Sequence, residues 1–470
     1  MWAVLGSLIG LSLYAGGAYC SLRAAQTART PQGAVGWVVF LLTAPFFALP
    51  AYLFLGQHRY KGYQIARRES AQVRRGIQEY SARNAPAPES TDVDLDPFEY
   101  CANLPAFRGN GMRLLIDGAD TFRAIFNAID RAESYVLVQF YIVRDDQLGR
   151  EMKQHLIAAA QRGVAIRFMT DAIGSKDLPD GYAAELRAAG VRVIDRHSAS
   201  GPRFRFHLNF RNHRKTVVVD GVTAFTGGMN VGDEYMGRDP RFGAWRDTHV
   251  QLSGPMVSQL QLIFVEDWHW MCDETLFEQL NWDAPHAPED ATGLIVATGP
   301  GDVSETGGLM FFSAIAAARH RLWIASPYFV PDLDIVTALR HAALRGVDVR
   351  VLVPHKADHL ITWLAAFAYF DDIRESGVRI FMYREGFMHQ KAFVVDDEIA
   401  AVGTTNMDNR SFRLNFETMA LFFDAGATGR VETMLRADFD RSTELDRTLD
   451  QQPRYVRYGA PLARLFAPLL

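Results

Sequence analysis

One short pattern occurs twice in the chain, with the form His-x-Lys-x4-Asp, then six intervening residues, then Gly-[Gly/Thr]-x-Asn. The first copy covers residues 213–230 and the second covers residues 389–406. The separation between the copies is the same at every matched position. Two copies with the same internal spacing predict a chain of two similar halves related by a pseudo-twofold axis, with one copy in each half.

The residue types in the pattern suit attack on a phosphodiester. A neutral imidazole is a good nucleophile toward an anionic phosphate, and a protonated imidazole can protonate the departing alkoxide. One site therefore needs two histidines in opposite protonation states, and His213 and His389 would supply them. Lys215 and Lys391 would place positive charge on the non-bridging oxygens, where charge develops in the transition state.

The remaining positions of each copy have distinct expected roles. Asn230 and Asn406 are expected to donate hydrogen bonds to the phosphate oxygens. Small residues just before them would let the backbone come close to a phosphate, namely Gly227, Gly228, Gly403 and Thr404. The runs after each His are rich in β-branched or aromatic residues, so His and Lys, two apart on a strand, would point to the same face. Asp220 and Asp396 lie beyond these strands and are expected to fix the strand ends.

The paired pattern resembles the HKD motifs of the phospholipase D superfamily. Its flanks, residues 226–235 and 403–417, are similar to those of bacterial cardiolipin synthases, and the similarity covers nearly the whole chain. The resemblance implies a catalytic set of His213, Lys215, Asp220, His389, Lys391 and Asp396. It also implies that a carboxylate orients the histidine of its own half, with Asp247 serving His213 and Glu417 serving His389.

The repeat extends beyond the motif. Strand-like runs at 134–143, 164–169 and 191–194 alternate with helical periodicity at 148–162 and 181–189, and the second half repeats this order from residue 321 to 383. We therefore expect an α/β fold of two fused phospholipase D-like α-β-α sandwich halves. The expected domains are a transmembrane hairpin (1–58), a basic amphipathic helix and linker (59–98), and the two halves (99–285 and 286–470).

Two stretches near the N-terminus, residues 2–20 and 34–56, carry no charge and are each about long enough to cross a bilayer as a helix. Arginines and lysines cluster after the second stretch, which predicts that the N-terminus and the catalytic body are cytoplasmic. Pro45 and Pro50 are expected to bend the second helix. A basic amphipathic helix is expected over residues 60–81, and it could lie on anionic headgroups or be an ordinary solvated helix.

Composition narrows the function classes. The formal net charge is −5, which argues against a nuclease-like phosphodiesterase. The three cysteines have no metal-ligand spacing, no zinc or magnesium ligand set is visible, and no cofactor is expected. Intact His, Lys, Asn and acidic positions in both halves argue against an inactive membrane scaffold.

The resemblance implies a multi-pass enzyme of the bacterial inner membrane that acts on phosphatidylglycerol. It would transfer a phosphatidyl group between two such lipids through a phosphatidyl-histidine and give cardiolipin and glycerol, with His213 as nucleophile and His389 as acid and base. A hydrolytic phospholipase D, or a transferase using another donor such as phosphatidylethanolamine, would use the same residues. The sequence does not separate these alternatives, and it leaves the oligomeric state open.

Some residues outside the motif could contact lipid. Arginines cluster before and within the first copy and could attract anionic headgroups, or could form a solvated strand edge: Arg203, Arg205, Arg211 and Arg214. The run 360–370 is unusually apolar, and a core helix is its default interpretation. Residues 462–470 could pack on the body or contact the membrane.

Overall fold

The computed structural model describes residues 2–28, 30–56, 84–85, 91–195, 211–302 and 304–470. The chain separates into two compact units, Met1–Gln64 and Ile65–Leu470. The helix expected over residues 60–81 and the residues Arg203 and Arg205 lie outside the described residues.

The N-terminal unit contains α1 (Trp2–Thr27), α2 (Pro31–Thr43) and α3 (Pro45–Leu55). Thr30 caps α2, its hydroxyl accepting the Gly33 N–H at 3.1 Å. The helices pack through a small apolar cluster that includes Cys20, Leu41 and Tyr52. Among the described helices, only α1 is both long and apolar enough to cross a membrane.

The second apolar stretch was expected to be one bent helix, and this expectation was wrong. The structure divides it into α2 and α3 at Ala44, whose backbone is non-helical at φ −138° and ψ 57°. Ala44 precedes Pro45, and a proline ring disfavours helical geometry in the residue before it. Pro50 lies within α3 without ending it. Each of the two helices is shorter than a hydrocarbon core is thick.

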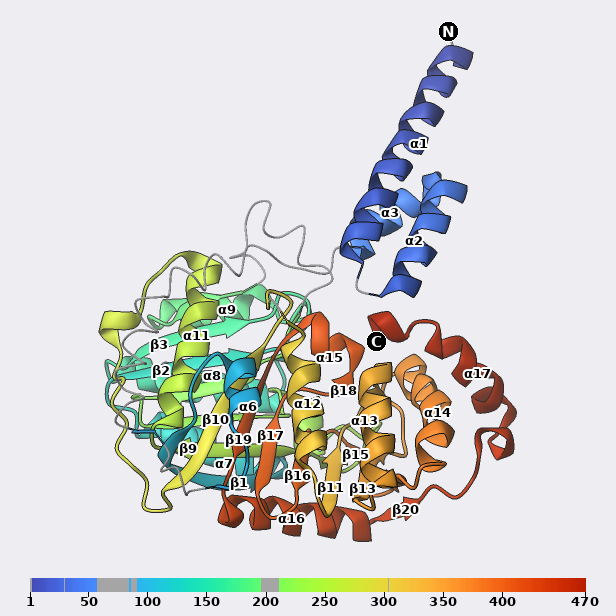
Figure 1. The fold of residues 1–470 in the computed structure, drawn as a ribbon. Coiled ribbons are helices and arrows are strands. Elements are labelled where there is room, and N and C mark those ends of the chain that lie inside the picture. The colour runs from blue at the N-terminus through green and yellow to red at the C-terminus, as the bar shows by residue number, and fades with distance from the viewer. Residues whose placement is uncertain (1, 29, 57–83, 86–90, 196–210, 303) are drawn as a thin grey trace. The chain divides into compact units, whose positions relative to one another are not determined.

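The body is built on one mixed sheet that runs through both halves (Figure 1). The strands of the first half are β1 (Phe107–Ile116), β2 (Tyr135–Phe140), β3 (Ala165–Thr170), β4 (Arg192–Ile194), β5 (Arg211–Asn212), β6 (Thr216–Val219), β7 (Thr223–Gly227), β8 (Trp245–Arg246) and β9 (Thr248–Ser253). Those of the second half are β10 (Ala291–Thr298), β11 (Arg321–Ala325), β12 (Phe329–Val330), β13 (Asp348–Pro354), β14 (Arg379–Tyr383), β15 (Phe387–Met388), β16 (Ala392–Val395), β17 (Ile399–Gly403), β18 (Met407–Asp408), β19 (Asn415–Phe422) and β20 (Ser442–Glu444).

The order of the strands shows the duplication. Counted outward from the centre, the first half runs β1-β9-β7-β6-β2-β3-β4 and the second runs β10-β19-β17-β16-β11-β13-β14, with β20 added at the edge. The halves join where β1 and β10 pair antiparallel, with Phe107 opposite Gly293. The fold is therefore the expected pair of α/β halves. The division at 285/286 stays a prediction.

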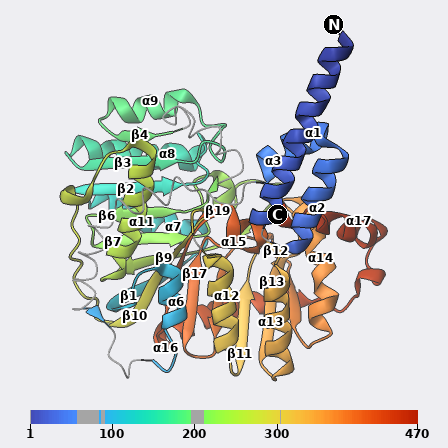
Figure 2. The same ribbon diagram turned by 45° about the horizontal axis from the view of Figure 1, so that its top comes forward.

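Helices cover both faces of the sheet (Figures 1 and 2). The helices of the first half are α6 (Asp96–Ala102), α7 (Asp117–Asp130), α8 (Gln147–Gln161), α9 (Asp180–Ala188) and α11 (Met256–Cys272), with 3₁₀ turns η1 (Asp233–Met236) and η2 (Phe277–Gln279). Those of the second half are α12 (Thr306–Ala317), α13 (Leu333–Leu344), α14 (Leu360–Arg374), α15 (Asn409–Arg413), α16 (Ala425–Asp440) and α17 (Arg454–Arg464), with η3 (Leu449–Gln451) and η4 (Ala467–Leu469).

The cores follow the period of two along each strand. In β19, Met419 and Leu421 join the core under α12, α13 and α14, whereas Ala420 and Phe422 join the core under α11 and α16. A third core lies between the first-half strands and α7, α8 and α9. The central strands are buried on both faces, which explains their continuous apolar runs.

Candidate active site

The backbone of each HKD histidine is hydrogen-bonded to a strand of the other half of the body. β5, just before His213, pairs in parallel with β19, and the His213 N–H donates to the Phe416 carbonyl at 2.9 Å. β15, just before His389, pairs with β8, and the His389 N–H donates to the Arg246 carbonyl at 2.8 Å. Each catalytic strand therefore enters the site along a strand of the other half.

The carboxylates consequently pair with the histidines in a crossed manner. Asp247 Oδ2 lies 2.8 Å from His389 Nδ1, and Glu417 Oε1 lies 3.2 Å from His213 Nδ1. The expectation that each carboxylate serves the histidine of its own half was wrong. Because the short strands β5 and β15 cross the junction, the nearest carboxylate to each ring comes from the opposite half.

Both carboxylates are fully buried and surrounded by donors. Asp247 accepts from the Thr248 N–H at 2.8 Å and from Trp245 Nε1 at 3.4 Å. Burial by itself raises the pKa of Asp247, but the charges of His389 and Lys391 and these hydrogen bonds outweigh it, so the pKa lies below its usual value. Asp247 is thus held as an anion.

Glu417 has equivalent support with different donors. It accepts from Thr404 Oγ1 at 2.5 Å and from Asn415 Nδ2 at 3.0 Å. Burial opposes its ionisation, but the interaction with His213, the charge of Lys215 and the hydrogen bond from Thr404 still lower the pKa of Glu417. The position matching Thr404 is Gly228, where an added Cβ would lie 2.0 Å from Asp247 Oδ1. The first half therefore requires a glycine where the second uses a hydroxyl.

The two lysines are buried beside their histidines. Lys215 Nζ donates to the His213 carbonyl at 2.6 Å, and Lys391 Nζ lies 2.9 Å from His389 Nδ1 and 3.0 Å from Nε2. Burial lowers the pKa of Lys215 to about 8 and that of Lys391 to about 7, where the charge of Lys215 contributes. The two motifs are thus close enough to share one electrostatic environment.

Burial favours the neutral form of both imidazoles. Burial is the largest cause that lowers the pKa of His213 and the pKa of His389, the latter to about 4. Their side chains nevertheless keep 19% and 13% of their surface exposed, while both carboxylates have none. A ligand can therefore reach the rings but not the groups behind them. An anionic phosphate between the rings would favour protonation of one of them.

Asp220 and Asp396 do not touch the site. The Asp220 carboxylate accepts the backbone N–H groups of three successive residues, 133–135, at 2.8–2.9 Å. Asp396 does the same for residues 319–321 at 2.7–2.8 Å. Both residues adopt positive φ, 53° and 49°, which aspartate tolerates better than most side chains. Their expected part in fixing the strand ends is confirmed, and their place in the catalytic set is not supported.

The two asparagines are turned toward protein partners. Asn230 accepts the Ile142 N–H at 3.0 Å and donates to Tyr235 Oη at 2.9 Å. Asn406 donates to Ser411 Oγ at 3.2 Å. These bonds hold the loops that follow β7 and β17. Direct donation from either amide to a phosphate stays a prediction.

Arg214 is not a headgroup-attracting residue. Its side chain is 1% exposed, and Nη1 lies 2.5 Å from Asp267 Oδ1. It also donates to the carbonyls of Thr298 and Glu417 at 3.2 Å. Neither alternative expected for Arg214, a headgroup-attracting residue or part of a solvated strand edge, was right, because its charge is paired with Asp267 of the same half in a buried ion pair. Its bonds to the Thr298 and Glu417 carbonyls join it to the second half. Arg211 lies on β5 and bonds to Tyr141.

Several site residues were not identified from the sequence. The Tyr141 ring lies 4.1 Å from the His213 ring, and the rings of Tyr235 and Tyr328 lie 6.3 and 6.4 Å from that of His389. The repeat held a signal for two of them, because Tyr141 and Tyr328 occupy matching positions in the two halves. His249 is buried beneath the site, where burial lowers its pKa to about 3, and the second half has Met419 there.

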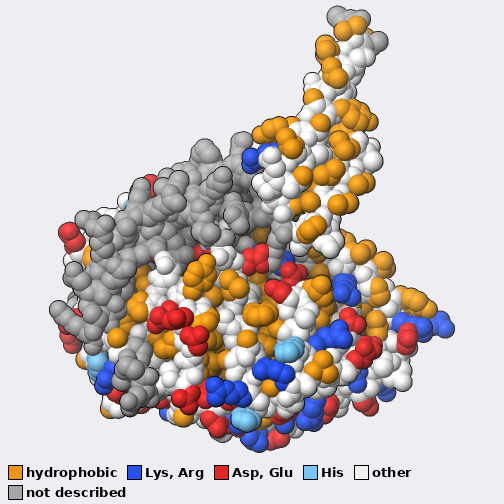
Figure 3. All heavy atoms as spheres, in the orientation of Figure 1, with side chains coloured by type: hydrophobic (Ala, Val, Ile, Leu, Met, Phe, Trp, Pro, Cys, Tyr) orange, Lys and Arg blue, Asp and Glu red, His pale blue; other side chains and the backbone are white. Residues whose placement is uncertain are grey.

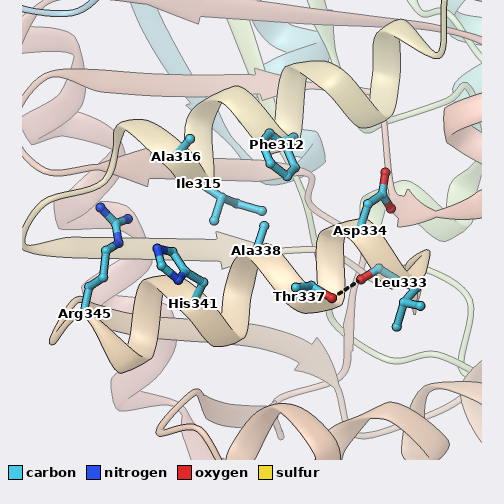
Figure 4. A pocket seen from close by; sticks show the side chains of 9 residues that line it. All are labelled: Phe312, Ile315, Ala316, Leu333, Asp334, Thr337, Ala338, His341 and Arg345. Carbon is cyan, nitrogen blue, oxygen red and sulfur yellow. Dashed lines mark hydrogen bonds between the residues drawn. The ribbon is translucent and has the colours of Figure 1, made fainter.

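One surface hollow lies away from these residues. A groove of about 520 Å³ runs between α12 and α13 and is lined by residues such as Phe312, Ile315 and Leu333 (Figure 4). None of the site residues lines it. Among the residues that the structure describes, no group of His, Cys, Asp and Glu is arranged to hold a metal ion.

The duplicated sheet and the two crossed His–carboxylate pairs define a phospholipase D-like enzyme. Comparisons with known proteins narrow the class. A family model for the phospholipase D-like domain of cardiolipin synthase matches residues 125–268 and 311–441. Cardiolipin synthase A of Pseudomonas fluorescens is 43% identical over 99% of this chain and 98% of its own, and that of Pseudomonas syringae is 44% identical over 97% and 96%. The chain belongs to the cardiolipin synthase family and is a phosphatidyltransferase.

A solved structure supports the fold independently. The phosphatidylserine synthase of Haemophilus influenzae aligns with 80% of this chain and 99% of its own at a TM-score of 0.61 and 14% identity. At this identity the likeness concerns the fold alone.

Proposed function

We propose that the chain transfers a phosphatidyl group from one phosphatidylglycerol to another, giving cardiolipin and glycerol. The observation that carries the proposal is the pair of crossed contacts, His389 with Asp247 and His213 with Glu417. Two buried carboxylates behind two neutral imidazoles form a site in which one ring can attack while the other carries a proton.

The proposed reaction has two steps. His213 attacks phosphorus through Nε2 and forms a phosphatidyl-histidine, while His389 protonates the departing glycerol oxygen. His389 then removes the proton from a hydroxyl of the second lipid, whose oxygen attacks phosphorus and releases His213. Lys215 and Lys391, in their protonated forms, would balance charge on the non-bridging oxygens.

The contact distances support this assignment of the two histidines. The carboxylate contact of His389, 2.8 Å, is shorter than that of His213, 3.2 Å. A closer carboxylate favours the imidazolium form more strongly, which suits the residue that must hold a proton. Asn415 Nδ2 also lies 3.2 Å from His213 Nδ1 and donates to Glu417. The His213 ring therefore shares the Glu417 carboxylate with the Asn415 amide.

The proposal includes attachment to the inner membrane of a bacterial cell with the catalytic body in the cytoplasm. The apolar helix α1 and the anionic lipid substrates support attachment. The basic cluster after residue 58 supports a cytoplasmic body. A reporter fused after Leu470 should score cytoplasmic, and a periplasmic signal would contradict this topology.

Product analysis tests the activity. The full chain, purified and reconstituted in phosphatidylglycerol vesicles, should release one glycerol for each cardiolipin formed. Phosphatidic acid as the main product would show hydrolysis instead. His213→Ala and His389→Ala should each lose turnover while the exposed-histidine control His320→Ala keeps it. Substantial cardiolipin formation by either site variant would refute the two-histidine scheme.

A further inference from the structure

The C-terminal helix α17 has its small apolar residues inside and its large ones outside. The residues that it buries are Val456, Ala460 and Ala463. The large residues exposed on the helix or just after it are Tyr455, Tyr458, Leu462, Leu465 and Phe466, each with 53–75% of its surface accessible. Exposed apolar residues that gather on one face mark an interaction site more often than scattered ones do.

The start of α14 extends this exposed surface. α17 packs on α14, with Gly459 against Leu364 and the Arg464 guanidinium 4.7 Å from the Tyr369 ring. The first residues of α14, Leu360 and Ile361, are 58% and 51% exposed. We call the seven exposed residues the C-terminal apolar face: Leu360, Ile361, Tyr455, Tyr458, Leu462, Leu465 and Phe466.

The charged side chains within residues 454–470 are all basic. Residues 454–470 contain three arginines and no acidic residue, and the arginines Arg454, Arg457 and Arg464 are exposed. Figure 3 shows hydrophobic and basic side chains close together on the right of the body, where α14 and α17 lie in Figure 1. Tyrosine and arginine beside leucine and phenylalanine is the composition of a helix that lies in the headgroup region of an anionic bilayer.

The C-terminal apolar face also borders the active site. Asp358 and His359 directly precede α14. Tyr328 bonds to Asp358, and its ring lies 6.1 Å from that of His359 and 6.4 Å from that of His389. At the other end, the chain after α17 returns to the site, where the Arg410 N–H donates to the Leu470 carbonyl at 2.7 Å. Both segments that carry the face are therefore joined to the rim of the site.

We infer that the C-terminal apolar face enters the headgroup region of an anionic bilayer, with α17 lying along the membrane surface. The inference rests on the proposed function, because a lipid substrate must pass from the bilayer to His213 and His389. It goes beyond that function by assigning the surface that contacts the bilayer. A lipid could then reach the rings without its acyl chains crossing water.

Fluorescence quenching by labelled lipids tests the contact without requiring turnover. The full chain would carry Cys272→Ser, which removes the exposed native thiol, together with Leu462→Cys labelled with an environment-sensitive dye. It would be reconstituted in phosphatidylglycerol–phosphatidylcholine vesicles, a part of the phosphatidylcholine carrying a nitroxide near the headgroup. We expect quenching of roughly twofold, as for a residue about 5–10 Å into the interface.

Leu344 offers a matched control site. It is 72% exposed at the end of α13, which connects the parallel strands β11 and β13. Leu344 precedes β13 and Leu360 follows it, so the two residues lie near opposite ends of this strand. A dye at Leu344→Cys should not be quenched. Equal quenching at both positions would overturn the inference. Protection of the dye at position 462 from the labelled lipids would also overturn the inference. Contact of this residue with the N-terminal unit or with a second copy of the chain would produce that result.

Activity provides a second readout. Leu462→Glu with Leu465→Glu should lower turnover of phosphatidylglycerol vesicles about tenfold, because two apolar contacts with the bilayer are replaced by charges that anionic lipids repel. Turnover of a monomeric short-chain phosphatidylglycerol should not change, nor should Leu344→Glu affect either substrate. Equal loss on both substrates would contradict the inference. Absence of cardiolipin together with quenching at 462 would refute only the proposed function.

Discussion

Asp247 Oδ2 lies 2.8 Å from His389 Nδ1, so the carboxylate of the first half orients the imidazole of the second. Glu417 completes the exchange by contacting His213. Neither half contains a complete His–carboxylate pair of its own. The duplication therefore yields one composite site, and separation of the halves would dismantle both pairs at once.

The crossed pairing predicts which histidine responds to each carboxylate. Asp247 raises the pKa of His389, so Asp247→Asn should lower the pKa of His389 further and leave His213 unchanged. Glu417→Gln should do the reverse. Hydrogen–deuterium exchange at the imidazole C2 position, followed by mass spectrometry, reports each pKa separately. A response within the same half would show that the pairing is wrong. The rate of phosphatidyl transfer should fall by about 10²–10⁴-fold in each variant.

Gly228 is expected to be intolerant of even one added carbon. A Cβ there would lie 2.0 Å from Asp247 Oδ1, which has no free space to move into because it is fully buried and hydrogen bonded. Gly228→Ala should therefore lower kcat nearly as much as Asp247→Asn. Gly181→Ala is the matched control, since an added Cβ there meets nothing within 4 Å. Wild-type kcat in Gly228→Ala would show that Asp247 can be displaced without harm.

Asp220 and Asp396 are expected to affect stability rather than chemistry. Each carboxylate satisfies three successive backbone N–H groups, and Ala would leave these donors without their acceptor. We expect Asp396→Ala to reduce the free energy of unfolding by about 2–4 kcal/mol. Asp397→Ala should cost less than about 0.5 kcal/mol, because the Asp397 side chain is 82% exposed.

Denaturant unfolding would measure the effect, and kcat would be determined well below the unfolding transition. The folded fraction of Asp220→Ala or Asp396→Ala should retain kcat within about threefold of wild type. A large loss of kcat at unchanged stability would return these aspartates to the catalytic set.

Much of the site could be predicted because its signal is local. The β-branched runs that follow the motif lysines form β6 and β16 as expected. The expectation that each His and Lys share the face of a strand was wrong, because residues 213–215 lie between β5 and β6 and residues 389–391 lie between β15 and β16. The equal separation of the two motif copies predicted the pseudo-twofold arrangement of the halves. The glycines that end the helices before β3 and β13, Gly163 and Gly346, also have positive φ as their positions require.

The crossed pairing could not be predicted, since it depends on contacts between distant segments. β5, β8 and β15 are two residues long and have no periodic signal, and only their partners show that they cross the junction. The prediction for Arg214 was wrong for a related reason. Its buried partner Asp267 lies on α11, a helix that sequence periodicity did not reveal, and a charge in a buried pair looks like a surface charge in sequence.

The lysines set the expected pH dependence. Lys215 and Lys391 can balance phosphate charge only when protonated, and burial lowers their pKa values to about 8 and about 7. The free enzyme should therefore lose kcat/KM as pH rises from about 7 to about 9. On the acid side, kcat/KM should fall where the nucleophile His213, whose pKa burial lowers from its usual value, gains a proton and can no longer attack phosphorus. Initial rates at fixed lipid composition and ionic strength would give this profile, and a basic limb near pH 10 would show that both lysines keep ordinary pKa values in the site.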